Sequence, residues 1–145
     1  MDKNTPIFFF SGLDRTGKSV TRKAFAQSTS EKYITFERSF LDNIVYDEIF
    51  RNIVLDEKTL RESISRFALL GNVYIVRLTL DFNEINRRAK RTEGIEYPLE
   101  ELIRCFELFD RYFVIAESLG INIITIDCNN KSVNEIVRDI VNEIE

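Results

Sequence analysis

The chain has 145 residues, of which 44% are apolar and 30% are charged. These values are typical of a single folded domain, which we predict to span 1–145. The net charge of -4 and the pI of about 5.1 disfavour a protein held on nucleic acid or on an anionic membrane by its overall charge.

Strands and helices are predicted to alternate along the chain. Residues 6–12 form a continuous apolar run that ends at a glycine, which is typical of a strand buried on both faces. A helix from residue 17 to about 28, a strand over 33–40 and a helix over 42–54 are expected next. The other predicted elements are a helix from Asp56 to Gly71, a strand over 72–80, a helix from Asp81 to about Thr92, a helix from Pro98 to Leu119, a strand over 121–126 and a helix from Ser132 to the end.

Capping residues and apolar spacing support these helices. Asp56 is a predicted N-cap, and Asp81 with Glu84 and Ser132 with Glu135 are predicted capping boxes. The long helix is expected to bury one stripe, formed by Leu102, Phe106, Phe109, Phe113 and Ala116. Strands separated by helices imply a parallel sheet covered on both faces, so the predicted fold class is α/β.

Several classes of protein are disfavoured by what the sequence lacks. No apolar run reaches the about 18 residues of a membrane span, and the first residues do not have the layout of a signal peptide. Cys105 and Cys128 belong to no CxxC pair, which disfavours a disulfide framework and a zinc site. The absence of histidine excludes His-based triads. We therefore expect a cytoplasmic protein without a membrane partner.

One loop carries a strong chemical signal. Residues 12–19, hereafter the phosphate loop, read G-x-x-x-x-G-K-S and lie between a predicted buried strand and a predicted helix. Glycines let successive backbone N–H groups turn towards a phosphate, and the helix presents its positive end to the same anion. Lys18 is expected to reach the β- and γ-phosphates and Ser19 to bind Mg²⁺. The predicted ATP-binding residues are Gly12, Leu13, Asp14, Arg15, Thr16, Gly17, Lys18, Ser19 and Val20.

The surrounding residues narrow the class of phosphate-loop protein. GTPases of this group carry an N-K-x-D motif that "NKSVNE" at 130–135 does not supply, and the apolar run ending in an acid that motor ATPases use is absent. "SGLDRTGKS" resembles the loop of thymidylate kinases, G-x-D-x-x-G-K-[ST]. That resemblance implies that Asp14 lies near the acceptor nucleotide and that Arg15 points to the transferred phosphoryl group.

Two further segments are similar to nucleoside and nucleotide kinases. "TFERSFLDNIVY" resembles the E-R-S motif of deoxynucleoside kinases, which implies that Glu37 helps to hold Mg²⁺ and that Arg38 binds the acceptor's oxygen. "INRRAKRTEGIEYPLEEL" resembles their lid, which places a lid segment near 85–97 with Arg87 and Arg91 over the phosphates. Glu93 stands where deoxynucleoside kinases commonly have a third lid arginine.

The chain departs from those families in one respect. Only 17 residues separate Ser19 from Glu37, several times fewer than is usual there, and the acid that deoxynucleoside kinases use as a base has no match. If Glu37 and Arg38 end the strand beside the first strand, the sheet has about four parallel strands in the order 2-1-3-4. The predicted fold is then the three-layer α/β/α fold of P-loop (phosphate-loop) NTPases. The acceptor site should then be more open than in full-length relatives.

The expected function is ATP-dependent phosphoryl transfer to a nucleotide, with ATP and Mg²⁺ as cofactors. A nucleoside monophosphate kinase of thymidylate-kinase type is favoured, because an ionised phosphate acceptor needs no base. A deoxynucleoside kinase would need Asp14, Glu37 or Asp42 as its base. The sequence is also compatible with a kinase acting on a nucleotide within DNA or RNA, which the acidic pI disfavours, and with an ATP-binding module without acceptor chemistry. Whether the chain forms a homodimer stays open.

The predicted site residues fall into three groups. The catalytic group consists of Lys18, Arg15, Arg38, Glu37, Arg87 and Arg91, and the metal group of Ser19 and Glu37. The acceptor-binding group consists of Asp14, Arg38, Asp42 and Phe40. Phe40, Tyr46 and Phe50 are the better aromatic candidates for stacking on a base, although packing in the core is the role that we favour for them.

Overall fold

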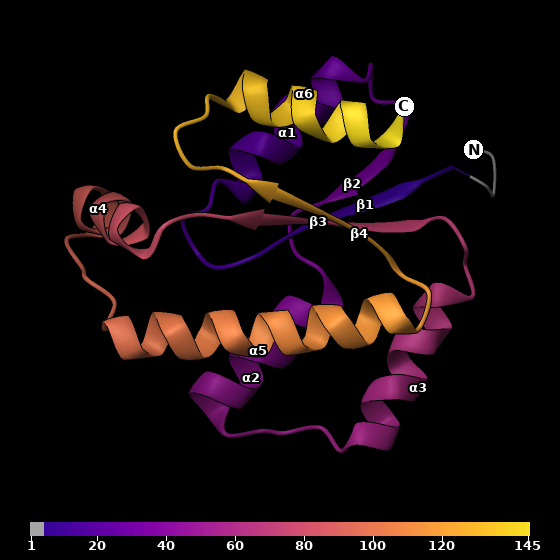
Figure 1. Ribbon diagram of the computed structural model, residues 1–145, viewed down its shortest axis with the longest axis horizontal. Helices are drawn as coiled ribbons and strands as arrows, with labels where there is room; N and C mark the ends of the chain where they lie inside the picture. The colour runs from indigo at the N-terminus through magenta and orange to yellow at the C-terminus, as the bar shows by residue number, and fades with distance from the viewer. Residues whose placement is uncertain (1–4) are drawn as a thin grey trace.

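Four parallel strands form one sheet in the computed structural model, which describes residues 5–145 (Figure 1). They are β1 (Ile7–Ser11), β2 (Ile34–Phe36), β3 (Val73–Thr79) and β4 (Asn122–Asp127). The strand order is β2-β1-β3-β4, which confirms the predicted order 2-1-3-4. The first four residues of the predicted domain lie outside the described residues.

Helices cover both faces of the sheet, as Figure 1 shows. One face carries α1 (Lys18–Ser28) and α6 (Val133–Ile144), and the other carries α2 (Phe40–Arg51), α3 (Glu57–Ala68) and α5 (Leu99–Ser118). The remaining helix, α4 (Phe82–Glu93), lies beyond the carboxyl end of β3, next to the turn that follows β1. Loops at the carboxyl ends of parallel strands form the ligand sites of open α/β sheets, so this end of the molecule is where a site is expected.

The apolar run of β1 is the centre of the core. Phe8 and Phe10 are 1% and 0% exposed, and the Phe8 ring lies 5.1 Å from that of Phe25 on α1. Phe9 faces the other side of the sheet, where the centre of its ring is 6.4 Å from that of Phe67 on α3. Side chains of β1 therefore contact both helical layers, as expected for a strand buried on both faces.

Segment boundaries differ from the prediction around α2. The strand predicted over 33–40 ends at Phe36, because Ser39 caps the next helix and its side chain accepts a hydrogen bond from the backbone of Leu41. The helix consequently begins at Phe40 and ends at Arg51, ahead of a left-handed residue. Ile53, which falls within the helix expected over 42–54, is outside it and 53% exposed.

The capping predictions were largely confirmed. Asp56 accepts a hydrogen bond from the backbone of Thr59, and Ser132 with Glu135 form a capping box. The box predicted for Asp81 and Glu84 is wrong, because Asp81 accepts from Asn83 while Glu84 pairs with arginines of its own helix.

The predicted stripe of α5 is buried except at one position. Phe106 is 37% exposed, and its ring lies over Arg77, whose guanidinium carbon is 5.0 Å from the ring centre. Arg77, which belongs to β3, donates a hydrogen bond to Asp110 of α5 at 3.0 Å. Among the described residues, no helix is both long and apolar enough to cross a membrane.

Replacement of Phe10 by alanine should lower the free energy of unfolding by about 3–5 kcal/mol, because the ring is fully buried and its loss leaves a cavity. Leu69→Ala is the control, since Leu69 is 85% exposed, and should change stability by less than about 1 kcal/mol. Urea denaturation followed by circular dichroism measures both values. Equal effects of the two substitutions would contradict the central position of β1.

Candidate functional site

The phosphate loop follows β1 and has an unusual backbone. Gly12, Arg15 and Gly17 have φ angles of 137°, 67° and 92°. A Cβ on Gly12 would lie 2.5 Å from the carbonyl oxygen of Leu78 on β3, so only glycine fits there without displacing the sheet. Gly17 precedes α1, whose first turn contains no acidic residue. The loop therefore ends at a helix terminus that is open to an anion.

Lys18 folds back across the loop. Its Nζ donates to the carbonyl oxygens of Gly12 at 2.7 Å and of Leu13 at 3.3 Å. Burial lowers the pKa of Lys18, while the negative charges of Asp42 and Asp14 act in the opposite direction. A largely buried cation is thus held at the centre of the loop, where it is able to meet phosphate oxygens.

Asp42 lies beneath the loop and is fully buried. Its carboxylate accepts hydrogen bonds from the hydroxyl of Ser11, from the backbone and hydroxyl of Ser39 at 3.0 and 2.9 Å, and from the backbone of Gly12 at 3.4 Å. Its Oδ2 is 3.8 Å from Nζ of Lys18. Asp42 was predicted to bind the acceptor, but these contacts place it under the loop. The S-x-x-D capping box from Ser39 to Asp42 is the sequence signal that indicates this position.

Glu37 and Arg38 follow β2 and take different directions. Glu37 is about half exposed, and its carboxylate lies 3.7 Å from Nε of Arg22 on α1. Arg38 has a φ of 147° and lines a hollow together with Asp14 and residues of α2. The role of Glu37 in metal binding stays a prediction.

A hollow of about 280 Å³, hereafter the α2 hollow, separates the loop from the exposed face of α2. The hydroxyl of Tyr46 donates to Asp14 at 3.3 Å, and its ring stacks 5.8 Å from that of Phe50. Burial raises the pKa of Tyr46 above its ordinary value, so its hydroxyl stays protonated. The residues that line the hollow are Asp14, Arg38, Asn43, Tyr46, Asp47, Phe50 and Arg51.

Phe40 does not line the α2 hollow. Its ring stacks on that of Phe67 of α3, with the centres 4.2 Å apart. Of the three aromatic candidates for base stacking, Tyr46 and Phe50 line the hollow, whereas Phe40 packs between helices.

Helix α4 contacts the loop through a residue that was not among the predicted site residues. Nη1 of Arg88 donates to the carbonyl oxygen of Arg15 at 2.9 Å. Glu84 accepts from Arg88 at 3.1 Å and from Arg87 at 2.6 and 2.7 Å, and the hydrogen bonds from Arg87 in particular lower the pKa of Glu84 to about 2. The run of basic residues in "RRAKR" did not distinguish Arg88 from Arg87, because only the position of the loop decides which one reaches it.

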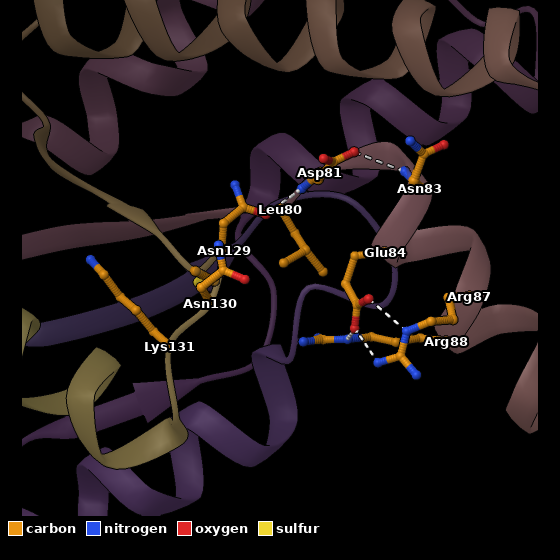
Figure 2. Close-up of a pocket in the computed structure, with 10 residues that line it drawn as sticks. Leu80, Asp81, Asn83, Glu84, Arg87, Arg88, Asn129, Asn130 and Lys131 are labelled. Atoms are coloured by element: carbon orange, nitrogen blue, oxygen red, sulfur yellow. Dashed lines mark hydrogen bonds and ion pairs between the residues drawn. The ribbon is translucent and has the colours of Figure 1, made fainter.

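Two hollows flank α4. One, hereafter the α1–α6 hollow, has a volume of about 280 Å³ and is lined by Thr16, Gly17, Val20, Thr21, Glu84, Arg87, Arg88, Arg91, Lys131, Val133 and Ile136. The other has a volume of about 780 Å³ and opens at the carboxyl ends of β3 and β4. Figure 2 shows it, with Glu84 and its two arginines on one side and Asn129, Asn130 and Lys131 on the other. The predicted residues Val20, Arg87 and Arg91 thus meet around one hollow beside the loop.

Comparison with known proteins identifies the fold. No family model and no curated protein matches the sequence. The structure is similar to that of the YorR protein from Bacillus subtilis in complex with phosphorylated GDP, with a TM-score of 0.73, 20% identity and 95% of each chain covered. At this identity the likeness is one of fold, and the predicted three-layer α/β/α fold is confirmed.

Two further solved structures overlap less well. A gluconokinase from Sinorhizobium meliloti 1021 has a TM-score of 0.44 and 16% identity, with 96% of this chain and 90% of that chain covered. The APS kinase CysC of Mycobacterium tuberculosis has a TM-score of 0.36 and 10% identity, with 97% and 96% covered. TM-scores this low support no conclusion about the site.

Asp42→Ala should lower the free energy of unfolding by about 3 kcal/mol, because it leaves buried hydroxyl and N–H groups unpaired and removes the nearest counter-charge of Lys18. Asp47→Ala on the same helix is the control, since Asp47 pairs with the exposed Arg51, and should cost less than about 1 kcal/mol. Urea denaturation of both variants measures the difference. A stable Asp42→Ala protein would contradict the role assigned to this carboxylate.

Proposed function

We propose that this protein is a P-loop kinase that transfers the γ-phosphoryl group of ATP to a nucleoside monophosphate. The position of the phosphate loop between two hollows carries the proposal. The α2 hollow adjoins the loop at Asp14, and the α1–α6 hollow adjoins it at Thr16 and Gly17. An ATP molecule in the α1–α6 hollow and an acceptor in the α2 hollow would meet over Lys18.

The carboxylates near the loop favour a phosphate acceptor over a hydroxyl acceptor. A hydroxyl needs a base, and the three candidates already have partners: Asp42 accepts from Ser11 and Ser39, Glu37 lies beside Arg22, and Asp14 accepts from Tyr46. A monophosphate oxygen is already ionised, so positioning and charge neutralisation suffice. The YorR protein was solved with phosphorylated GDP, and the shared fold supports a nucleotide ligand here too.

The chain's own residues supply the binding of the donor phosphates. The N–H groups of the loop and the N-terminus of α1 attract the phosphates, and Lys18 would leave its carbonyl partners to donate to the β- and γ-oxygens. Arg87 and Arg91, which line the α1–α6 hollow, would neutralise the remaining charge, Arg87 after leaving Glu84. Val20 would contact the base or sugar, since it is 58% exposed in the same hollow.

The loop fits a magnesium-bound nucleotide. Gly12 lets the backbone of the loop turn around a phosphate, and the first turn of α1 contains no acidic residue that would repel it. The hydroxyl of Ser19, in the first turn of α1, would bind the Mg²⁺ that accompanies the phosphates. Within residues 5–145 no group of three or more acidic or cysteine side chains is arranged to hold a metal ion, so binding would rely on Ser19, on Glu37 and on the phosphates themselves. When bound, Mg²⁺ supplies neutralisation of the phosphate charge.

The transfer needs no proton movement. An ionised oxygen of the acceptor phosphate forms a bond to the γ-phosphorus, the bond to the β–γ bridging oxygen breaks, and ADP leaves with that electron pair. Arg38 and Asp14 line the α2 hollow and would place the acceptor, while Arg15 at the loop would neutralise charge on the transferred group.

Lys18→Ala should lower acceptor-dependent ADP release a hundredfold or more, because the substitution removes the cation that would donate to the β- and γ-phosphate oxygens. Lys23→Ala is the control, since Lys23 is an exposed lysine of the same helix, and should leave the rate unchanged. The assay uses labelled ATP and Mg²⁺ with a panel of nucleosides, nucleoside monophosphates and short oligonucleotides.

The panel also distinguishes between the competing functions. Transfer to nucleosides alone would identify a nucleoside kinase, and transfer to oligonucleotides alone would identify a kinase acting within nucleic acid. Binding of ATP with no ADP release for any acceptor would identify a binding module. Full activity of the Lys18→Ala variant would contradict phosphoryl transfer at this loop.

Arg38→Ala should raise the KM for the acceptor or lower kcat about tenfold or more while ATP affinity changes little, because Arg38 lines the α2 hollow and not the α1–α6 hollow. Arg66→Ala, an exposed arginine on α3, is the matched control. ATP affinity is measured by equilibrium binding and turnover by ADP release. Equal losses in ATP binding and in turnover would mean that Arg38 has a structural role instead.

A further inference from the structure

The side chain of Arg15 is held by helix α4. Its Nη2 forms an ion pair with Oε1 of Glu93, the last residue of α4, while Arg88 of the same helix donates to its carbonyl oxygen at 2.9 Å. Arg15 also has a left-handed backbone, with a φ of 67°. Both the main chain and the side chain of this loop residue are therefore fixed by α4.

The Nε donor of Arg15 is unsatisfied. It is buried and has no hydrogen-bond partner among the residues that the structure describes. A buried donor without an acceptor is costly, so one that persists in a folded protein calls for a water or an ion that accepts its hydrogen bond. The orphaned Nε therefore indicates a ligand atom that accepts its hydrogen bond.

Tyr97, a neighbour of Arg15, is itself hydrogen-bonded to α4. Tyr97 lies near both Arg15 and Asp14: burial, followed by the charge of Asp14, raises the pKa of its hydroxyl, and Arg15 acts in the opposite direction. The backbone of Tyr97 exchanges two hydrogen bonds with the side chain of Asn86, at 2.7 and 3.0 Å. Tyr97 is thereby joined to α4 on the side of the loop where Arg15 lies.

We propose that Glu93 is a positioning residue for phosphoryl transfer. Its carboxylate binds one edge of the Arg15 guanidinium and leaves Nε directed to an oxygen of the transferred phosphoryl group. This inference rests on the proposed function. Glu93 does not contact the phosphate, since two anions would repel each other there. It acts through Arg15, which explains why an acidic residue stands at a lid position where an arginine would neutralise phosphate directly.

The ion pair is well suited to mutation because it contributes little to folding. Both side chains are partly exposed, at 29% for Arg15 and 48% for Glu93, and exposed pairs contribute little to stability. Glu93→Gln keeps the shape of the side chain and removes its charge. A change in catalysis would then report on the orientation of Arg15 rather than on unfolding.

A double-mutant cycle on the full chain tests the proposal. We expect Glu93→Gln to lower kcat about tenfold, with the KM for ATP and for the acceptor within about twofold of wild type. Arg15→Ala should lower kcat more, and adding Glu93→Gln to it should cause no further loss. Glu96→Gln, an exposed acid of the same lid segment, is the control and should match wild type. Glu93→Asp should recover part of the lost rate.

The opposite results would overturn the proposal in distinguishable ways. An unchanged kcat in Glu93→Gln, or independent effects of the two substitutions, would overturn it. A raised kcat would overturn it too, because Glu93 would then hold Arg15 away from the phosphoryl group. If the wild-type chain transfers phosphate to no acceptor in the panel, the proposed function itself fails. Additive effects in an active enzyme overturn the role of Glu93 alone.

Discussion

The Asp42 carboxylate joins the end of β1, the phosphate loop and the start of α2 at one buried point. Ser11, Gly12 and Ser39 donate to it, and Lys18 lies 3.8 Å away. A buried carboxylate with several donors and a nearby cation is stable, whereas the loss of either charge would leave the other unpaired. The position of Lys18 and the direction in which α2 leaves the sheet therefore depend on the same group. Most of the residues that line the α2 hollow belong to α2, so the contacts of Asp42 also determine where an acceptor would bind.

The fold was predictable where local signals agree with each other. The apolar run of β1, the glycines of the loop and the cap at Ser132 each act within a few residues, so these elements follow from the sequence. The order β2-β1-β3-β4 was expected from the resemblance of Glu37 and Arg38 to a kinase motif that ends the strand beside the first, and the structure confirms it. The boundary between β2 and α2 was missed because Ser39 serves as a cap, which ends the strand early although Phe40 continues the apolar pattern. In the same way Phe106 matches the spacing of a buried stripe, yet it covers the side chain of Arg77.

The site was predictable at the loop and less so around it. G-x-x-x-x-G-K-S indicates phosphate binding because the chemistry of the loop lies in consecutive residues. The contacts of Asp42 with Ser11, and of Glu93 with Arg15, join residues far apart in the sequence, so they depend on the folded positions of α2 and α4. Glu93 is informative for this reason. At the sequence level it departs from a pattern of lid arginines, whereas in the structure it is the partner of the loop arginine.

The phosphate loop is proposed to serve a donor on one side and an acceptor on the other. A single-turnover experiment examines this arrangement: γ-labelled ATP is bound to the protein, and a nucleoside monophosphate is then added. We predict that the label appears in the nucleoside diphosphate in one step, with stoichiometric release of ADP. Recovery of the label only as ATP or as free phosphate, for every monophosphate added, would contradict the claim that the phosphate loop serves both the donor and the acceptor.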